Sequence, residues 1–298
     1  MGFGEFAPDF FMKEVFNSEA KSMTTSTQDF DAKKVNVYGH IAALQLKLTV
    51  VTVKGTGIYD GAATAHIGVS KLIIRDRASK PVIDSRGVDL AYVRKILTIA
   101  DTLNDGTVKK GEYDAATAIS TDVTTIQTQE LPIDINLADQ PISVEWTLDV
   151  LSKLYSTVGT ATATVQLQIL SKNIVSSEAL NRQTRRIYSF TRGAFSTEIE
   201  LQNNLPTGIL IDNITVLEAS AADIKDVTLK PTGQNIGLDR VNETYLDEYE
   251  NRNFWDGKTA LLQILPHPPF KVADETLFSI NPSVSFNPRF FITHRGSR

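Results

Sequence analysis

The sequence contains no cysteine. That absence excludes a disulfide framework, catalysis by a thiolate, and metal sites with thiolate ligands. The sequence also has no run of about 18 consecutive apolar residues, the length that an α-helix needs to cross a bilayer, so no membrane span is predicted. The first residues, MGFGEFAPDFFMKEVF, place Glu5 and Asp9 where a secretion signal is basic, and therefore predict no cleaved signal.

An excess of positive charge is also missing. The formal net charge is −5, whereas a dedicated nucleic-acid-binding domain is usually basic. Hydrophobic residues make up 42% and charged residues 22% of the chain, which is ordinary for a globular protein with well-formed cores. A length of 298 residues is typical of two domains of about 150 residues each.

Familiar catalytic motifs are absent from the sequence as well. There is no Gly-x-Ser-x-Gly nucleophile elbow, and no particular pair of carboxylates indicates a glycoside hydrolase. The histidines, His40, His66, His267 and His294, are scattered, so a metal site would have to be assembled from distant strands. We therefore predict no catalytic, cofactor-binding or metal-binding residue, and no cofactor.

Two segments resemble ligand loops only in part. Residues 101–112 place Asp, Gly and Glu as a calcium-binding EF-hand loop does, but Leu103 and Lys109 occupy positions that should supply or support oxygen ligands. A turn is the better interpretation. Residues 55–61, GTGIYDG, lack the Gly-Lys-Ser/Thr and the following helix of a phosphate loop, and predict a surface hairpin.

Acidic, aromatic and basic clusters allow both a binding and a structural interpretation. Residues 246–257, LDEYENRNFWDG, hold acids and aromatics that would suit a sugar site, but also fit a helix with one packing face and one solvated face. Arginines gather at two places, where they would contact a partner or water. These are Arg182, Arg185, Arg186 and Arg192, and then Arg289, Arg295 and Arg298.

Strand patterns dominate the chain. Within residues 35–53, the alternation from Leu44 to Val50 of leucine and valine with polar residues is typical of a half-buried strand. Further strands are predicted at residues 71–76, 81–87, 131–137, 141–151, 160–170, 196–220, 227–230, 234–239, 260–265, 276–280 and 289–294. Residues 21–34 and 103–130 are interpreted as polar connections, and residues 171–195 as a break in the strand rhythm.

Three segments follow the helical period of 3.6 residues. Residues 9–21 predict a short amphipathic helix whose phenylalanine face docks on its own domain, on a neighbouring subunit or on lipid. A second helix is predicted from Val88 to Leu103, and a third near residues 241–252. The result is seven or eight short strands and one helix in each half, the outline of two β-sandwiches or jelly rolls in tandem.

The two halves repeat one order of elements. Aligning them places Leu72 opposite Val227 and Gly39 opposite Gly208, with an edge-like strand, a glycine turn, a long strand, a strand pair and a helix in each half. Two copies are too few for a solenoid. They suit either a duplicated binding module or a near-symmetric tile, because three such chains would present six similar barrels around a threefold axis.

The order of segments resembles the double jelly-roll major capsid proteins of tailless icosahedral viruses of bacteria and archaea. The resemblance covers residues 30–298. It rests on Val35–Val50 and Ile199–Val216 as the opening strand pairs, on residues 69–97 and 224–255 as the strand–turn–strand–helix units, and on residues 142–170 as the last strand pair of a first barrel.

This resemblance implies an all-β fold of two tandem jelly-roll barrels, each with a short helix, preceded by an amino-terminal amphipathic helix. The expected divisions are an amino-terminal arm (1–29), a first jelly roll (30–170), a linker and boundary region (171–195) and a second jelly roll (196–298).

The implied function is that of a structural capsid protein, not an enzyme. It would form homotrimers of pseudo-hexagonal outline in the virion shell, after synthesis in the host cytoplasm. Its partners would be its own copies, penton or minor capsid proteins, and an internal membrane reached by the amino-terminal arm, without sequence-specific binding of nucleic acid. The alternatives are a two-domain carbohydrate- or receptor-binding β-sandwich protein of the fibre or adhesin type, and a β-sandwich hydrolase.

Overall fold

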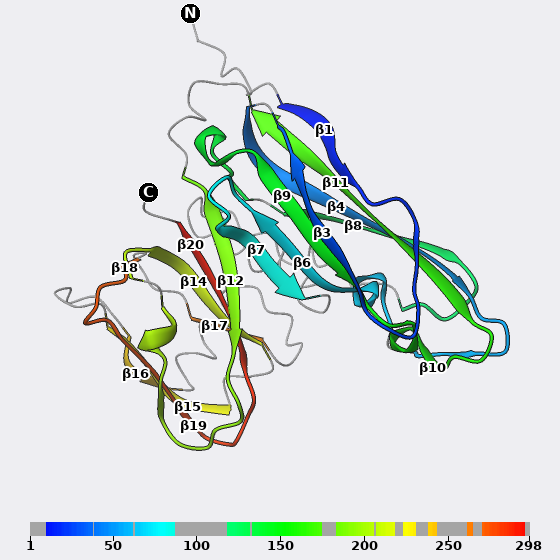
Figure 1. Cartoon of the computed structure of the whole chain (residues 1–298). Coiled ribbons are helices and arrows are strands. Elements are labelled where there is room, and N and C mark those ends of the chain that lie inside the picture. Colours follow the sequence, from blue (N-terminus) through cyan, green and yellow to red (C-terminus); the bar gives the residue numbers. More distant parts are fainter. Residues whose placement is uncertain are drawn as a thin grey trace, which may run out of the picture. The chain divides into compact units, whose positions relative to one another are not determined.

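The computed structural model describes residues 10–37, 39–61, 63–86, 118–131, 133–174, 183–205, 207–217, 223–230, 238–242, 261–264 and 270–295. These residues form β-strands and a few short 3₁₀ helices (Figure 1). No helix among them is long and apolar enough to cross a membrane. The chain divides into two compact units, of which the first comprises residues 1–94 and 114–184 and the second residues 95–113 and 185–298.

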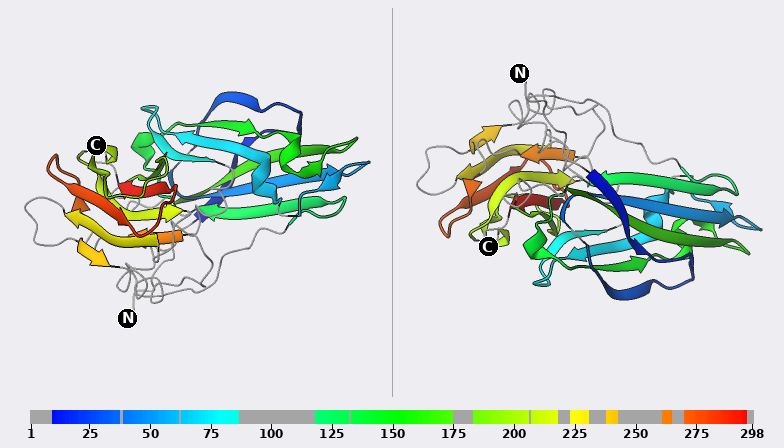
Figure 2. Two further views of the ribbon diagram at one scale, coloured as in Figure 1. Left: turned by 90° about the horizontal axis from the view of Figure 1, so that it is seen from below. Right: turned by 90° about the horizontal axis from the view of Figure 1, so that it is seen from above.

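The first unit is a sandwich of two antiparallel sheets, seen as two layers in Figure 2. One sheet has the order β1-β11-β4-β8, with the short strand β2 also paired to β11. The bounds of these strands are β1 Phe10–Asn17, β2 Lys21–Ser22, β4 His40–Val53, β8 Thr124–Leu131 and β11 Thr162–Ile174. The other sheet has the order β7-β6-β9-β3, with bounds β3 Gln28–Val35, β6 Val69–Arg75, β7 Pro81–Arg86 and β9 Ile142–Leu148.

Alternation of buried and partly exposed residues along the strands forms the core of this unit. On the long strand β4, Leu44, Leu46, Leu48 and Val50 are buried, and the residues between them are partly exposed. This is expected for a strand with one face on the core and one on solvent. Trp146 of β9 is 1% exposed and stacks on Phe30 of β3, with ring centroids 4.7 Å apart.

The second unit is also a two-sheet sandwich. One sheet has the order β17-β14-β20-β12, with β18 also paired to β14, and the other has the order β13-β19-β15-β16. The bounds are β12 Arg185–Thr191, β13 Ile199–Glu200, β14 Leu210–Leu217, β15 Ile224–Lys230, β16 Leu238–Asn242, β17 Leu261–Ile264, β18 Phe270–Lys271, β19 Leu277–Pro282 and β20 Arg289–Arg295. Side chains such as Ile214, Val227, Phe278, Phe290 and Ile292 form its hydrophobic core.

Both units have the same connectivity. Counting the eight main strands of each unit in chain order, one sheet runs first, eighth, third, sixth and the other runs second, seventh, fourth, fifth. The predicted repeat is therefore confirmed in topology. Leu72 and Val227, aligned from sequence alone, lie on the fourth main strand of their units and are both fully buried.

The aligned glycines also have matching backbone conformations. Gly39 has φ 81° and Gly208 has φ 82°. Gly39 directly precedes β4, and Gly208 lies one residue further from the start of β14; these are the third main strands of their units. Positive φ is a region that glycine adopts without the steric cost that a side chain brings. A sequence match of two glycines thus corresponds to one repeated turn.

Several local predictions are wrong. Residues 10–17 form strand β1 and not the predicted amphipathic helix, because their backbone pairs with β11 over seven residue pairs. Strands β3 and β8 lie in segments interpreted as polar connections, and β12 lies in the predicted boundary region. The strand predicted over residues 131–137 is not seen as one element: Leu131 ends β8, Ile135 forms an isolated bridge with Ile41, and Leu137 begins a 3₁₀ helix. The helix from Val88 to Leu103 lies outside the described residues, as does the helix near 241–252 beyond its first two residues, which end β16.

Candidate functional site

No cluster of metal-binding side chains is found among the described residues. None of their His, Asp and Glu side chains gather in groups of three or more that could hold a metal ion. His40 lies at the start of β4 with its Nε2 2.8 Å from Asp134, His66 lies in a 3₁₀ helix (Ala65–Gly68), and His294 lies on β20. His267 and the EF-hand-like residues 101–112 lie outside the described residues.

His294 lies in an apolar and cationic environment. It is 8% exposed and pairs across the ladder with Arg186 of β12. Burial disfavours the charged imidazolium, and the guanidinium of Arg186 disfavours it further, so the pKa of His294 is lowered to about 4. The imidazole is therefore neutral at pH 7.

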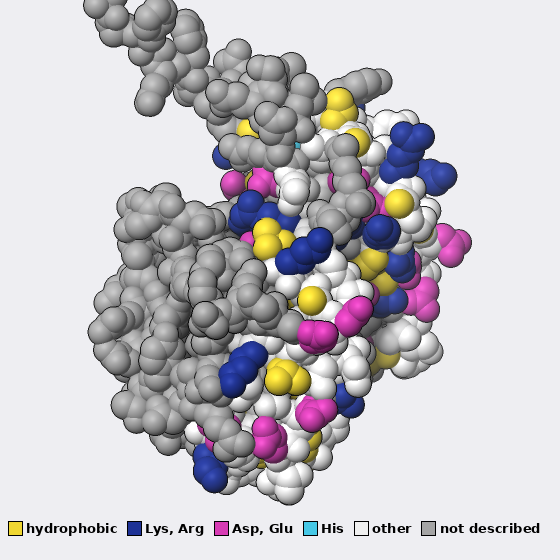
Figure 3. Space-filling model, turned by 90° about the vertical axis from the view of Figure 1, so that its left-hand side faces the viewer, with side chains coloured by type: hydrophobic (Ala, Val, Ile, Leu, Met, Phe, Trp, Pro, Cys, Tyr) yellow, Lys and Arg dark blue, Asp and Glu magenta, His cyan; other side chains and the backbone are white. Residues whose placement is uncertain are grey.

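Among the described residues, the arginines that cluster in sequence do not form one exposed basic surface; Arg182 and Arg298 lie outside these residues. Arg185 and Arg186 are buried in β12, 2% and 9% exposed. Arg192 donates to Asn204 at 2.8 Å, and Arg295 donates to Asp212 at 3.2 Å. Figure 3 shows both acidic and basic side chains among the described residues on one side of the molecule.

The GTGIYDG segment forms a close turn at one end of the first unit. Gly55 and Gly159 have φ 53° and 52°, and each lies against the threonine that follows the other glycine. The amide of Thr56 donates to Oγ1 of Thr160 at 3.0 Å, and the amide of Thr160 donates to Oγ1 of Thr56 at 3.0 Å. The glycines therefore serve a reciprocal contact between two turns.

Two tyrosines complete this end of the sandwich. Ile58–Tyr59 (β5) pairs with Tyr155–Thr157 (β10), and the rings of Tyr59 and Tyr155 stack with centroids 4.9 Å apart. The Tyr59 hydroxyl donates to Asp122 at 2.6 Å, which lowers the pKa of that carboxyl. Burial and the hydrogen bond to Asp122 raise the pKa of Tyr59, so its phenol stays protonated at neutral pH.

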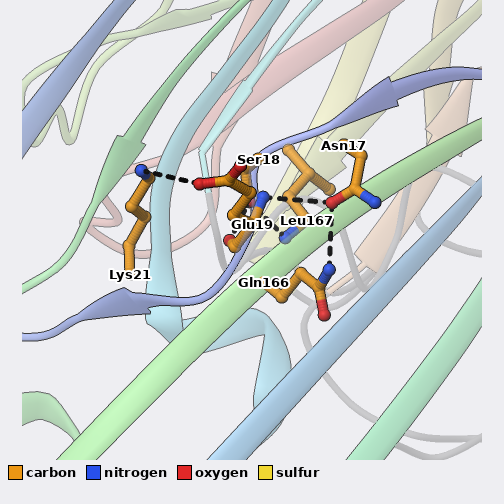
Figure 4. Close-up of polar contacts among 6 residues, drawn as sticks. All are labelled: Asn17, Ser18, Glu19, Lys21, Gln166 and Leu167. Carbon is orange, nitrogen blue, oxygen red and sulfur yellow. Dashed lines mark hydrogen bonds and ion pairs between the residues drawn. The ribbon is translucent and has the colours of Figure 1, made fainter.

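The end of β1 is fixed by a compact polar turn, drawn in Figure 4. Ser18 exchanges two hydrogen bonds with the backbone of Leu167, each 2.9 Å long, one through its amide and one through its hydroxyl oxygen. Asn17 accepts from the Gln166 side chain at 2.9 Å and from the Glu19 amide at 3.0 Å. Glu19 has φ 57°, and the chain turns there before Lys21 pairs again with β11.

The outer face of the sheet β7-β6-β9-β3 is charged. Glu145 on β9 lies between Lys71 and Arg75 of β6, at 3.6 Å and 3.3 Å. These side chains are about one third exposed, and pairs of this kind keep a surface solvated and contribute little to stability.

The outer face of the sheet β1-β11-β4-β8 has a different character. From Thr49 to Val53, the outward positions of β4 and the positions paired with them are uncharged. Val51 and Val53 are 39% and 49% exposed, and Ile126 on the neighbouring β8 is 56% exposed. Sequence reasoning missed this surface, because β8 was interpreted as a polar connection.

Comparisons of fold identify capsid proteins. No family model and no curated protein matches the sequence. The crystal structure of the STIV MCP aligns with 96% of this chain and 97% of its own, with a TM-score of 0.61 and 12% identity. A chain of Sulfolobus turreted icosahedral virus aligns with 96% of this chain and 91% of its own, with a TM-score of 0.62 and 10% identity.

A bacterial virus provides a third match. The major capsid protein P2 of bacteriophage PM2 aligns with 97% of this chain and 99% of its own, with a TM-score of 0.53 and 10% identity. At such identities the likeness concerns the fold. The predicted resemblance is confirmed at that level: this chain is all-β and shares its fold, over nearly its whole length, with major capsid proteins of an archaeal and a bacterial virus.

Proposed function

We propose that this protein is the structural major capsid protein of a tailless icosahedral virus, with the double jelly-roll fold and without catalytic activity. One observation carries the proposal: two units with the same order of eight strands follow each other in one chain, whose length matches that of viral capsid proteins. Its place is then the capsid of the virion, after synthesis in the host cytoplasm.

The mechanism of such a protein is assembly. Three chains with two similar sandwiches each give six similar units, which fill a near-hexagonal tile on a threefold axis. The 14-residue strand β4 and the 13-residue strand β11 exceed the usual five or six residues of a strand. Long, hydrogen-bonded strands of this kind suit a stiff wall, and the connecting loops and chain ends suit lateral contacts.

The proposed divisions keep the predicted boundary region, residues 171–195, because the chain passes from β11 to β12 there. The first jelly roll, expected over residues 30–170, is proposed to include β1 of the expected arm (1–29), and the second, expected over 196–298, to include β12. The proposed partners are other copies of the chain, penton or minor capsid proteins, and an internal membrane reached by the amino-terminal arm. Sequence-specific nucleic-acid binding is not part of the proposal.

Native mass spectrometry combined with negative-stain imaging of the purified protein tests this function. We expect a trimer of near-hexagonal outline. Protein that stays monomeric over the whole range of salt and pH examined would refute the capsid function. Saturable binding of a glycan by the monomer would instead support a carbohydrate-binding protein, and turnover abolished by replacing one acid or histidine would support a hydrolase.

A further inference from the structure

One outer face of the first unit is open and suited to contact with protein. Alternation places every second residue of β4 and β11 away from the core, together with their partners on β8. We call this surface the open face. Its outward residues are Gln45, Lys47, Thr49, Val51 and Val53 on β4, Thr124, Ile126, Thr128 and Glu130 on β8, and Thr162, Thr164, Gln166, Gln168 and Leu170 on β11.

The composition of the open face is that of an interface centre. Charged side chains on this side of the sheet gather towards one end: Lys47 and Glu130, with Lys172 beside Glu130 and Glu14 beside Gln168. The rows from Thr49 to Val53 contain only threonine, glutamine, valine and isoleucine. Depletion of charge distinguishes the centre of a protein interface from ordinary surface. By contrast, the outer face of the other sheet carries the charged group around Glu145.

Ile126 is an apolar residue at a position that is exposed to solvent. On β8 the core-facing positions include Thr125 and Gln127, which lie opposite Val50 and Leu48, whereas the outward position holds isoleucine. An edge strand exposed to water would show the reverse pattern, because burial favours the apolar side chain. The reversal indicates that the outward side of β8 is covered in the functional state.

The equivalent positions of the second unit are buried. On that unit's corresponding sheet, the side opposite the core carries Ile187, Thr215, Phe291 and Thr293, and all four are 0% exposed. A duplicated chain thus buries one of two equivalent faces and leaves the other exposed. In an assembly of identical chains, a second copy can cover the face that remains exposed on the first unit.

The size of the open face suits the central part of a stable contact. The nine residues of β4 from Gln45 to Val53 span about 30 Å at ~3.3 Å per residue, and three strands span about 14 Å, which gives an area of about 420 Å². A typical specific interface buries about 800 Å² on each partner, so the open face would provide about half of one.

From these observations we infer that the open face is covered by a second copy of this chain, and that Val51, Val53 and Ile126 lie at the centre of that contact. This inference rests on the proposed function, because it names the surface through which copies meet. It assigns the subunit contact to one sheet of the first unit and leaves the charged sheet facing solvent.

A matched pair of substitutions tests it. Ile126→Glu places a charge on the open face, and Ile58→Glu places the same charge on β5, at a residue with nearly the same exposure (56% against 55%). We expect Ile126→Glu to weaken self-association at least about tenfold in sedimentation velocity, and Ile58→Glu to leave it unchanged. Circular dichroism and the thermal midpoint of each variant report whether the fold is retained.

The outcomes separate the inference from the proposed function. If the native protein does not associate at all, the proposed function fails, and the inference with it. If the native protein and Ile126→Glu associate equally, or both variants lose association equally, the inference is overturned and the proposed function stands.

A second measurement does not depend on a destabilising charge. Because the chain has no cysteine, Val51→Cys introduces a single thiol on the open face, and Ile58→Cys introduces one elsewhere. We expect assembly to slow the reaction of Val51→Cys with a maleimide at least about tenfold, relative to diluted monomer, and to leave Ile58→Cys unchanged. Equal reactivity of Val51→Cys in both states would contradict the inference.

Discussion

Lowering the pH from 7 to 5 should destabilise the second unit through His294. In the folded protein the pKa of this side chain is about 4, because it is buried and lies beside Arg186, whereas an exposed histidine has a pKa of 6.5. Below pH 6.5 the unfolded chain therefore binds a proton that the folded chain does not bind. Stability from this residue is fully present above pH 6.5 and is lost as the pH falls towards 4.

The size of the effect follows from the difference between the two pKa values. At 1.36 kcal/mol per pKa unit, a shift from 6.5 to about 4 corresponds to about 3 kcal/mol over the whole window. Linkage places about 2 kcal/mol of this loss between pH 7 and pH 5. That is a large share of the stability of an ordinary domain, about 5–15 kcal/mol.

Two measurements check this reasoning. Denaturant unfolding at pH 7 and pH 5 gives the loss of free energy, which we expect to be about 2 kcal/mol smaller in His294→Gln than in the native protein. The ring protons of the histidines, only four in the chain, give the pKa directly by NMR, and His294→Gln assigns the signal. We expect Arg186→Gln to raise the pKa of His294. A His294 ring that titrates near pH 6.5, with parallel stability profiles for native protein and His294→Gln, would refute the argument.

Three further predictions concern the first unit. Gly55→Ala should destabilise it by about 1 kcal/mol or more in thermal unfolding, because the residue has φ 53° and a Cβ would lie 2.4 Å from Oγ1 of Thr160. Gly61→Ala is the control and should have little effect, because a Cβ there would meet open space. Trp146→Ala should cost about 3–5 kcal/mol in denaturant unfolding, because it removes a side chain that is 1% exposed, and a loss below about 1 kcal/mol would contradict its place in the core. Glu145→Gln should change the free energy of unfolding by less than about 1 kcal/mol, because its ion pairs are partly exposed; a larger loss in the same assay would mean that they are effectively buried.

The two outer faces of the first unit differ in composition. A surface with exposed valine and isoleucine and few charges favours association, whereas the charged face around Glu145 keeps the other side of the sandwich in water. In the proposed assembly, one sheet of the first unit would contact another copy and the other would face solvent. That asymmetry would let copies meet in one way, which a closed assembly requires.

Local sequence patterns predicted the central strands and the repeat. From Leu44 to Val50, apolar and polar residues alternate because one face of the strand is buried. This pattern can be recognised without knowing which strands pair with it. The glycines before the third main strands were matched by position alone, and the structure gives them equal φ values. The two units share one strand order, in agreement with the same succession of strands and turns in both halves of the sequence.

Edge strands and the amino terminus were not predictable in the same way. Residues 10–17 fit a helical pattern, yet β11, some 150 residues further along the chain, provides hydrogen-bond partners for their backbone. β3 and β8 pair at the edges of their sheets and carry polar side chains on both faces, so their period is weak.

The sequence by itself determined that the chain is a duplicated all-β protein without cysteine chemistry, because composition and strand period are local properties. Only the tertiary structure decided which residues share a surface. The lowered pKa of His294, the contact between the Gly55 and Gly159 turns, and the uncharged face around Ile126 all arise from segments that are distant in the chain. Long-range strand pairing brings them together, and no local period records that pairing.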